Sequence, residues 1–143
     1  MRFSLFTLPA ALFAAVASGH TVDCWGKGLN APVEGVDYVI ELMDKVALGK
    51  LSHLPHKSDG KWLYTKPGEC RELACLKEAQ VRWCNTGGLG HQLMMQNIVD
   101  AVKVLRRECS AVVNGVDTAG GVLYQPDNWN IILQQEDKCK DKK

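Results

Sequence analysis

The sequence predicts an α+β fold in which two helices pack on one face of an antiparallel sheet, cross-linked by about three disulfides. Three observations predict it: two stretches with apolar residues at helical spacing, several short strand-like stretches, and six cysteines. Short connections between consecutive strands favour antiparallel pairing. The expected order of elements is helix, strand, strand, helix, strand, strand.

The first helix is expected from Gly35 to Gly49. Apolar side chains recur there at i, i+3, i+4 and i+7 spacing, with charged residues off this stripe. Gly49 suits the C-terminal cap because glycine adopts the left-handed conformation without a Cβ penalty. The next segment, KLSHLPHKSDGK (residues 50–61), is rich in polar and helix-breaking residues and predicts a loop.

Two strands are expected next. KWLYTK (residues 61–66) is short and aromatic and stops at Pro67. In ACLKEAQVRWC (residues 74–84) the odd positions are mostly apolar and polar residues fall between them, which predicts one half-buried strand. Lys77 is the exception on its inner face and is expected near the exposed start of this strand. NTGGLGH (residues 85–91) predicts a turn.

The second helix is expected from Gln92 to Arg107, with Cys109 continuing its apolar stripe. Residues 110–120 are expected to connect it to two strands, GVLY (residues 121–124) and WNIILQ (residues 129–134), which the turn-forming QPDN separates. The last eight residues, EDKCKDKK, are highly charged. We expect this tail to be solvated and held by Cys139.

Residues 1–19 have the order of a secretory signal peptide: Arg2, an apolar run from Leu5 to Ala17, and small residues up to Gly19. The run is shorter than the roughly 20 residues of a membrane span, and no other stretch approaches its apolar length. The expected mature protein is one secreted, extracellular domain, residues 20–143, without a membrane span.

The cysteine content supports that interpretation. An even number of cysteines after a secretory signal favours disulfides, whereas zinc sites use closely paired ligands that the wide gaps here do not provide. The sequence leaves the pairing open. The expected disulfide residues are Cys24, Cys70, Cys75, Cys84, Cys109 and Cys139.

Cleavage after Gly19 would make a histidine the first residue, and its free amine and imidazole together could chelate copper. The residues weighed for such a site are His20, His53, His56 and His91. We favour the structural interpretation, in which Cys24 anchors the terminus, and expect no resident metal or cofactor. No catalytic residue is assigned: the pair Glu69 and Glu72 is expected to be ionised and solvated.

GGLGHQ (residues 87–92) has two interpretations: an anion site at a helix entrance, or a turn whose glycines need positive φ. We favour the turn. The chain has 17 basic side chains, Arg2 among them, and 16 acidic ones, so nothing favours nucleic acid.

The four tryptophans divide into two pairs. Trp83 and Trp129 lie in expected strands with inward alternation and are expected in the core. Trp25 and Trp62 lie near loops. They are the candidate binding surface, because aromatic side chains are enriched at interfaces and could stack on a carbohydrate.

Several segments together resemble a known class of proteins. They are CW (residues 24–25), GKWLY (60–64), ECRELAC (69–75), QVRWCN (80–85), a long helix ending in Cys109, GGVLY (120–124) and DNWNIIL (127–133). In their order and cysteine placement they are similar to small secreted cysteine-rich proteins of filamentous fungi, especially the necrosis-inducing effector family and killer-toxin-like α/β-sandwich proteins.

That resemblance implies a non-enzymatic virulence effector or toxin-like protein that binds a host or microbial surface protein or glycan. It carries over no active residue. The alternatives are a small secreted enzyme, either with a copper site at His20 or a hydrolase, and a structural wall protein.

Overall fold

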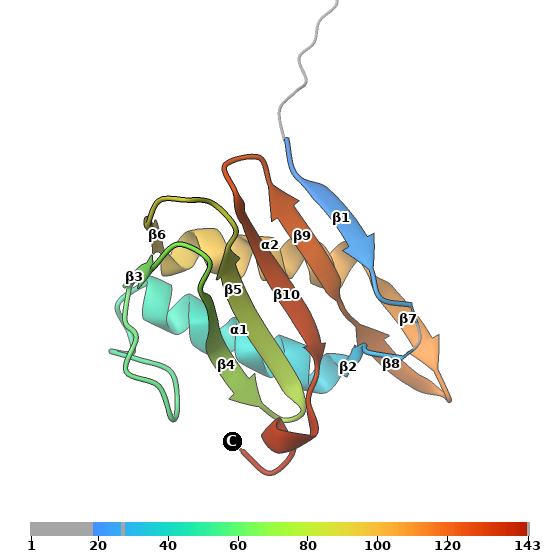
Figure 1. Cartoon of the computed structure of the whole chain (residues 1–143). Coiled ribbons are helices and arrows are strands. Elements are labelled where there is room, and N and C mark those ends of the chain that lie inside the picture. Colours follow the sequence, from blue (N-terminus) through green and yellow to red (C-terminus); the bar gives the residue numbers. More distant parts are fainter. Residues whose placement is uncertain (1–18, 27, 143) are drawn as a thin grey trace, which may run out of the picture.

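The computed structural model describes residues 19–26 and 28–142, and it confirms the α+β fold class. Two helices lie side by side on one face of a five-stranded antiparallel sheet (Figure 1). The expected signal peptide lies outside the described residues except for Gly19. Within the described ranges no helix combines the length and apolar character needed to cross a membrane.

The main sheet has the strand order β1-β9-β10-β5-β4. Its strands are β1 (Thr21–Cys24), β9 (Gly121–Gln125), β10 (Trp129–Gln135), β5 (Ala79–Asn85) and β4 (Cys70–Leu76). The helices are α1 (Val33–Ala47) and α2 (Met95–Glu108), and the chain ends with a short 3-10 helix, η2 (Asp137–Cys139).

Two smaller sheets flank the main one. At one end lies a three-stranded sheet of β2 (Ala31–Pro32), β8 (Val116–Ala119) and β7 (Ser110–Val113). At the other end lies a two-stranded ribbon of β3 (Trp62–Thr65) and β6 (His91–Met94), called the β3–β6 ribbon below (Figure 1).

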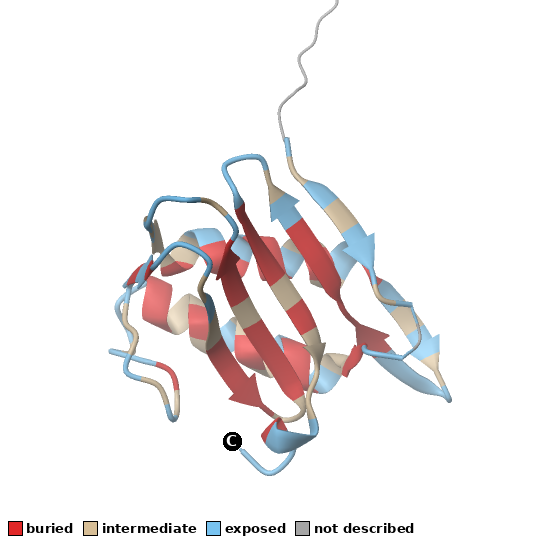
Figure 2. Cartoon of the chain, in the orientation of Figure 1, coloured by how far each residue is buried: buried red, intermediate tan, exposed pale blue. Residues whose placement is uncertain are grey.

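The core lies between the helices and the main sheet (Figure 2). On the central strands, Ile131 pairs with Trp83 and Leu133 pairs with Val81, and all four side chains are fully buried. The helices contribute apolar stripes at helical spacing, with each aliphatic side chain stabilising the fold by about 1.5–3 kcal/mol on burial. The fully buried helix residues include Val36, Val39, Met43, Ile98, Val102 and Leu105.

The first helix is confirmed, although it starts two residues before the expected Gly35. Leu48 is its C-cap and Gly49 has φ of 77°, the left-handed conformation expected of it. The second helix was expected too early: residues 91–94 form β6, where Met94 pairs with Trp62, and α2 begins at Met95. Pairing with β3 therefore makes residues 91–94 a strand, although the helical pattern of the sequence already begins there.

The prediction of one strand over residues 74–84 was wrong. The chain reverses at Lys77 and Glu78, whose φ values of 46° and 70° are left-handed, and two strands result. Such hairpin turns usually carry asparagine or glycine, so the sequence did not indicate this one. Contacts from elsewhere stabilise it: the N–H groups of Lys77 and Glu78 donate to the carbonyl groups of Lys142 (2.9 Å) and Cys139 (3.1 Å).

Those contacts also correct the expectation of a solvated tail. Cys139 is fully buried, and the N–H of Glu136 donates to the carbonyl of Glu78 at 3.0 Å. The tail therefore packs on the β4–β5 turn. The β7–β8 hairpin was not expected either, although Asn114 and Gly115 form its turn with φ of 51° and 78°. Strands β1 and β2 were also missed.

All six cysteines form disulfides, as expected, and no described cysteine is free. Cys24–Cys109 joins β1 to the end of α2, Cys75–Cys139 joins β4 to the tail, and Cys70–Cys84 cross-links β4 and β5. The first two span 85 and 64 residues. In the chain-entropy account, closing such long loops restricts the unfolded chain most.

The outer edge of the main sheet at β4 is irregular. The register shifts between Glu72 and Ala74, which marks a β-bulge. The loop between α1 and β3, and β3 itself, contact this edge: Arg71 pairs with Asp59 of the loop and donates to the carbonyl of Tyr64 in β3 at 2.6 Å. The β3–β6 ribbon is thereby tied to the sheet.

Replacing Gly35 by alanine should destabilise the protein. Gly35 lies in α1, where alanine is intrinsically better by about 1 kcal/mol. Its new Cβ, however, would overlap the backbone carbonyl oxygen of Lys77. We expect a net loss of about 1–3 kcal/mol, measured as a lower Tm. Gly28→Ala is the matched control, because a Cβ at Gly28 meets no atom of the described residues within 4 Å. Equal Tm values for the two variants would contradict the close approach of α1 and the β4–β5 turn.

Candidate functional site

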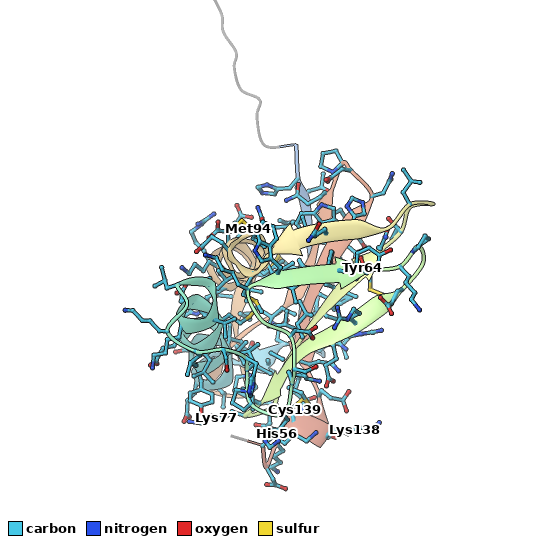
Figure 3. All side chains as sticks on the ribbon, turned by 90° about the vertical axis from the view of Figure 1, so that its left-hand side faces the viewer. His56, Tyr64, Lys77, Met94, Lys138 and Cys139 are labelled. Carbon is cyan, nitrogen blue, oxygen red and sulfur yellow. A yellow bond between two sulfur atoms is a disulfide. The ribbon has the colours of Figure 1, made fainter. Side chains whose placement is uncertain are left out.

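The β3–β6 ribbon presents two aromatic rings to solvent. Leu63 and Thr65 of β3 are buried, whereas Trp62 and Tyr64 are 59% and 55% exposed. Successive side chains of a strand point to opposite sides, so Trp62 and Tyr64 share the outer face of the ribbon. Figure 3 shows β3 and β6 crossing this end of the molecule, with Tyr64 on β3.

Contacts on several sides fix the ribbon in place. Trp62 pairs with Met94 and Tyr64 pairs with Gln92 across the two strands. The backbone N–H of Met95, at the start of α2, donates to the carbonyl of Lys61 at 2.8 Å. Together with Arg71 on the Tyr64 carbonyl, these bonds tie the ribbon to both the helix layer and the main sheet.

A glycine loop, defined as Thr86–Gly90, lies next to the ribbon. Asn85 braces it from within: this 1% exposed side chain donates to the carbonyl of Leu89 at 2.7 Å and accepts the N–H of Gly87 at 2.9 Å. The N–H of Thr86 donates to the carbonyl of Asn128 at 2.8 Å, in the β9–β10 turn. Leu89 is held 80% exposed at the tip.

The expectation for this glycine-rich segment was wrong in two respects. The loop leads into strand β6 rather than into a helix, and Gly87, Gly88 and Gly90 are not among the described glycines with positive φ. Close packing explains Gly87 and Gly90 instead, whereas a Cβ at Gly88 would meet no described atom within 4 Å. A Cβ at Gly87 would lie 3.0 Å from the Cβ of Asn128, and one at Gly90 would overlap the hydroxyl end of Tyr64.

The glycine loop and the β9–β10 turn enclose a depression of about 310 Å³, lined by residues 87–91, Asp127 and Asn128. It offers a carboxylate, an amide and an imidazole beside backbone amide groups. Gly90 lines the depression and also contacts Tyr64. The depression and the two exposed rings therefore adjoin each other at Gly90.

The structure separates the two tryptophans of the candidate binding surface. Trp62 is exposed, whereas Trp25 is half-buried and its indole Nε1–H donates to the carbonyl of Leu133 at 2.9 Å. Trp25 thus links the β1–β2 connection to β10. Trp83 and Trp129 are 0% and 6% exposed, which confirms their expected place in the core.

The four histidines lie in three separate parts of the fold. His20 precedes β1 and lines a depression of about 210 Å³ with Asn97, Asp100 and Trp129, among others. His53 and His56 lie in the loop between α1 and β3, and His91 begins β6. In the described ranges, none of the four belongs to a group of three or more potential metal ligands.

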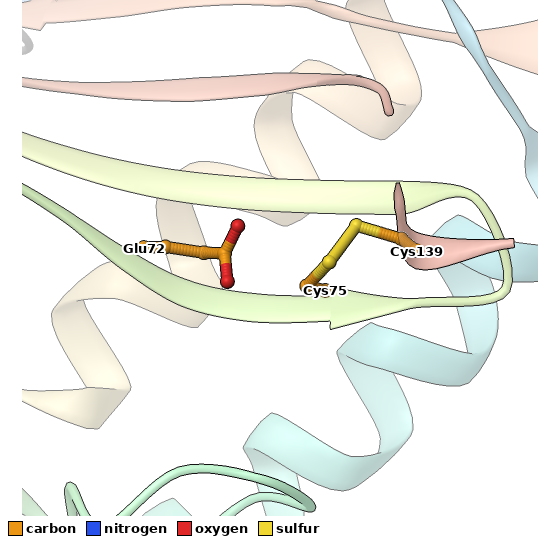
Figure 4. Close-up of side chains that lie close together, drawn as sticks. All are labelled: Glu72, Cys75 and Cys139. Atoms are coloured by element: carbon orange, nitrogen blue, oxygen red, sulfur yellow. A yellow bond between two sulfur atoms is a disulfide. The ribbon is translucent and has the colours of Figure 1, made fainter. Parts of the chain in front are cut away.

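One such group does occur among the described residues: Glu72, Cys75 and Cys139, whose ligand atoms lie within 4.8 Å of one another (Figure 4). The two sulfur atoms are bonded to each other. A disulfide sulfur lacks the thiolate charge with which cysteine holds a transition metal. The group therefore describes a carboxylate packed beside a disulfide.

Glu72 is half-buried rather than freely solvated as expected, because it takes part in a network on the outer face of the sheet. Its carboxylate accepts hydrogen bonds from Lys57 and from Gln80 (2.7 Å), and Gln80 in turn accepts one from Gln134 (2.8 Å). Burial would raise the pKa of Glu72. The hydrogen bonds from Lys57 and Gln80 and the charge of Lys57 outweigh it, so the pKa lies below its ordinary value.

Sequence reasoning identified Trp62 but missed Tyr64, Leu89, Asp127 and Asn128. The alternation in WLYT was the signal that placed Tyr64 on the same face as Trp62. Comparisons of this chain with protein-family models, with curated proteins and with solved structures find no match.

Replacing Glu72 by glutamine should lower stability in a pH-dependent way. A depressed folded-state pKa stabilises the protein above the unfolded value of about 4.3, and this contribution disappears as pH falls through the folded value. At neutral pH we expect Glu72→Gln to cost up to about 1 kcal/mol. The difference in Tm from the unsubstituted protein should shrink toward pH 3.

Glu41→Gln, which alters a well-exposed carboxylate paired with Lys45, is the control and should show the smaller effect. A Tm difference for Glu72→Gln that is independent of pH would exclude the charge of Glu72 as its origin.

Proposed function

We propose that this chain is a disulfide-stabilised, secreted protein without catalytic activity that binds a surface target on a host or a competing microbe. The observation that carries the proposal is the solvent exposure of Trp62 and Tyr64, side by side on a rigid ribbon. Large aromatic side chains supply much contact area at low entropic cost, and they dominate binding surfaces for that reason.

Rigidity supports the same proposal. The two rings protrude from a ribbon whose backbone is bonded to α2 and to Arg71, and Leu89 is held out by the braced glycine loop. A surface ordered before binding loses little conformational entropy on association. Exposed apolar groups in one region of a monomer are also typical of interaction sites.

The three disulfides are compatible with an extracellular protein, because such bonds persist in oxidising compartments. Secretion and action as an effector or toxin-like protein, similar to the fungal proteins named above, are part of the proposal. The resemblance in element order and cysteine placement supports it.

Trp62→Ala should abolish most target binding while leaving the fold intact. The side chain is 59% exposed, so its loss removes few internal contacts. The measurement is retention of fluorescently labelled protein, residues 20–143, on intact plant cells and on fungal hyphae, and we expect a loss of about tenfold or more.

Two further variants separate binding from folding. Trp25→Ala should lower Tm, because it removes the hydrogen bond to Leu133. Val112→Ala, at an exposed position on β7 near the other end of the molecule, should change neither property (Figure 1). If the unsubstituted protein is retained on neither surface, or if Trp62→Ala is retained equally well, the proposal is wrong.

A further inference from the structure

We propose that the exposed rings and the glycine-loop depression together bind an uncharged oligosaccharide segment of a surface polysaccharide. This inference rests on the proposed function and names the chemistry of its target. A sugar chain offers two kinds of contact at once: an apolar C–H face on each ring, and hydroxyl groups around its rim. The ribbon and the depression match these two contacts separately.

The rings of Trp62 and Tyr64 suit the apolar faces of sugar rings. Both protrude on the same side of β3, and each exposes more than half of its surface. The hydroxyl end of Tyr64 lies against Gly90, where a larger residue would displace it. The Tyr64 ring is thus positioned before any ligand arrives, which reduces the entropy lost on stacking.

The surface of the depression is mainly apolar, and the few polar groups that line it suit the hydroxyl groups. A hydroxyl both donates and accepts, so it pairs with carboxylates, amides and backbone N–H groups alike. The Asp127 carboxylate forms no hydrogen bond or ion pair within the part of the chain that the structure describes, and the same holds for the backbone N–H groups of Gly88 and Gly90. A volume of about 310 Å³ is at the small end for ligand sites and fits one or two sugar rings.

The two parts are joined in a way that suits a chain molecule. Gly90 lines the depression and contacts Tyr64, so a ligand leaving the depression passes directly onto the Tyr64 ring and then toward Trp62. The bracing of the loop by Asn85 fixes this geometry. Leu89 at the tip adds an apolar contact beside the depression.

The charges around the site favour an uncharged ligand. Lys61 and Lys66 stand at the two ends of β3, and Asp127 lines the depression. Glu69 lies beside Lys66, and its carboxylate accepts a hydrogen bond from the backbone N–H of Lys66 at 3.1 Å. Two basic and two acidic groups give no excess of either sign. An anionic membrane surface or an acidic polymer would instead favour a clustered basic patch.

The test is calorimetric titration of the protein, residues 20–143, with soluble hexasaccharides of β-1,4-glucose, β-1,3-glucose, β-1,4-N-acetylglucosamine and α-linked mannose. We expect at least one to bind. Trp62→Ala, Tyr64→Ala and Asp127→Ala should each weaken that binding by about tenfold or more, and Val112→Ala should leave it unchanged. Near-ultraviolet circular dichroism verifies that each variant is folded. Asp127→Ala distinguishes a sugar site from non-specific adhesion to the two rings.

Absence of binding by every hexasaccharide at millimolar concentration would overturn the inference, as would equal binding by Trp62→Ala or Asp127→Ala. Vesicles of phosphatidylcholine with phosphatidylserine form a second arm: binding to them through Trp62, without sugar binding, would assign the surface to lipid. If no hexasaccharide binds but retention on cells still depends on Trp62, the inference about sugar is wrong and the proposed function stands. If retention on cells fails too, both proposals fall.

Discussion

The two helices bury one face of β5 and β10, and the rest of the structure is arranged around that burial. Trp83, Ile131 and Leu133 are fully inaccessible to solvent there. Trp83 is buried although its Nε1–H has no hydrogen-bond partner within the described part of the chain, a cost of about 1–3 kcal/mol that the apolar burial of the ring outweighs. The disulfides connect this core to outlying segments: β1 to the end of α2, and the C-terminal tail to β4.

Sequence reasoning succeeded where local pattern and tertiary environment agree. The apolar stripes of α1 and α2, the pair β9 and β10, and the burial of Trp83 and Trp129 follow from hydrophobic periodicity, because those residues face the core. The local pattern is misleading where distant segments determine the conformation. The left-handed turn at Lys77 and Glu78 depends on carbonyl groups of the tail, more than fifty residues along the chain.

The candidate site shows the same division. The aromatic content of KWLYTK predicted a strand, and its place near a loop predicted an exposed Trp62. The sequence did not indicate which residues from other segments would adjoin Trp62. Asp127 and the glycine loop meet because Asn128 bonds Thr86 across the sheet. The glycines of the loop were attributed to backbone conformation, whereas Gly87 and Gly90 provide room for Asn128 and Tyr64. Whether a position must be glycine for lack of space depends on the residue that packs against it. That residue is distant in the sequence and is known only from the folded chain.

The irregular edge at β4 has a consequence for the protein in solution. A straight, uncovered edge strand exposes unpaired backbone groups that recruit strands of other molecules and so initiate aggregation. Here the bulge after Glu72 and the charged side chains of Arg71 and Glu72 interrupt such a template, and the opposite edge, β1, is only four residues long. The shape of its two sheet edges therefore disfavours the addition of strands from other copies of the folded protein.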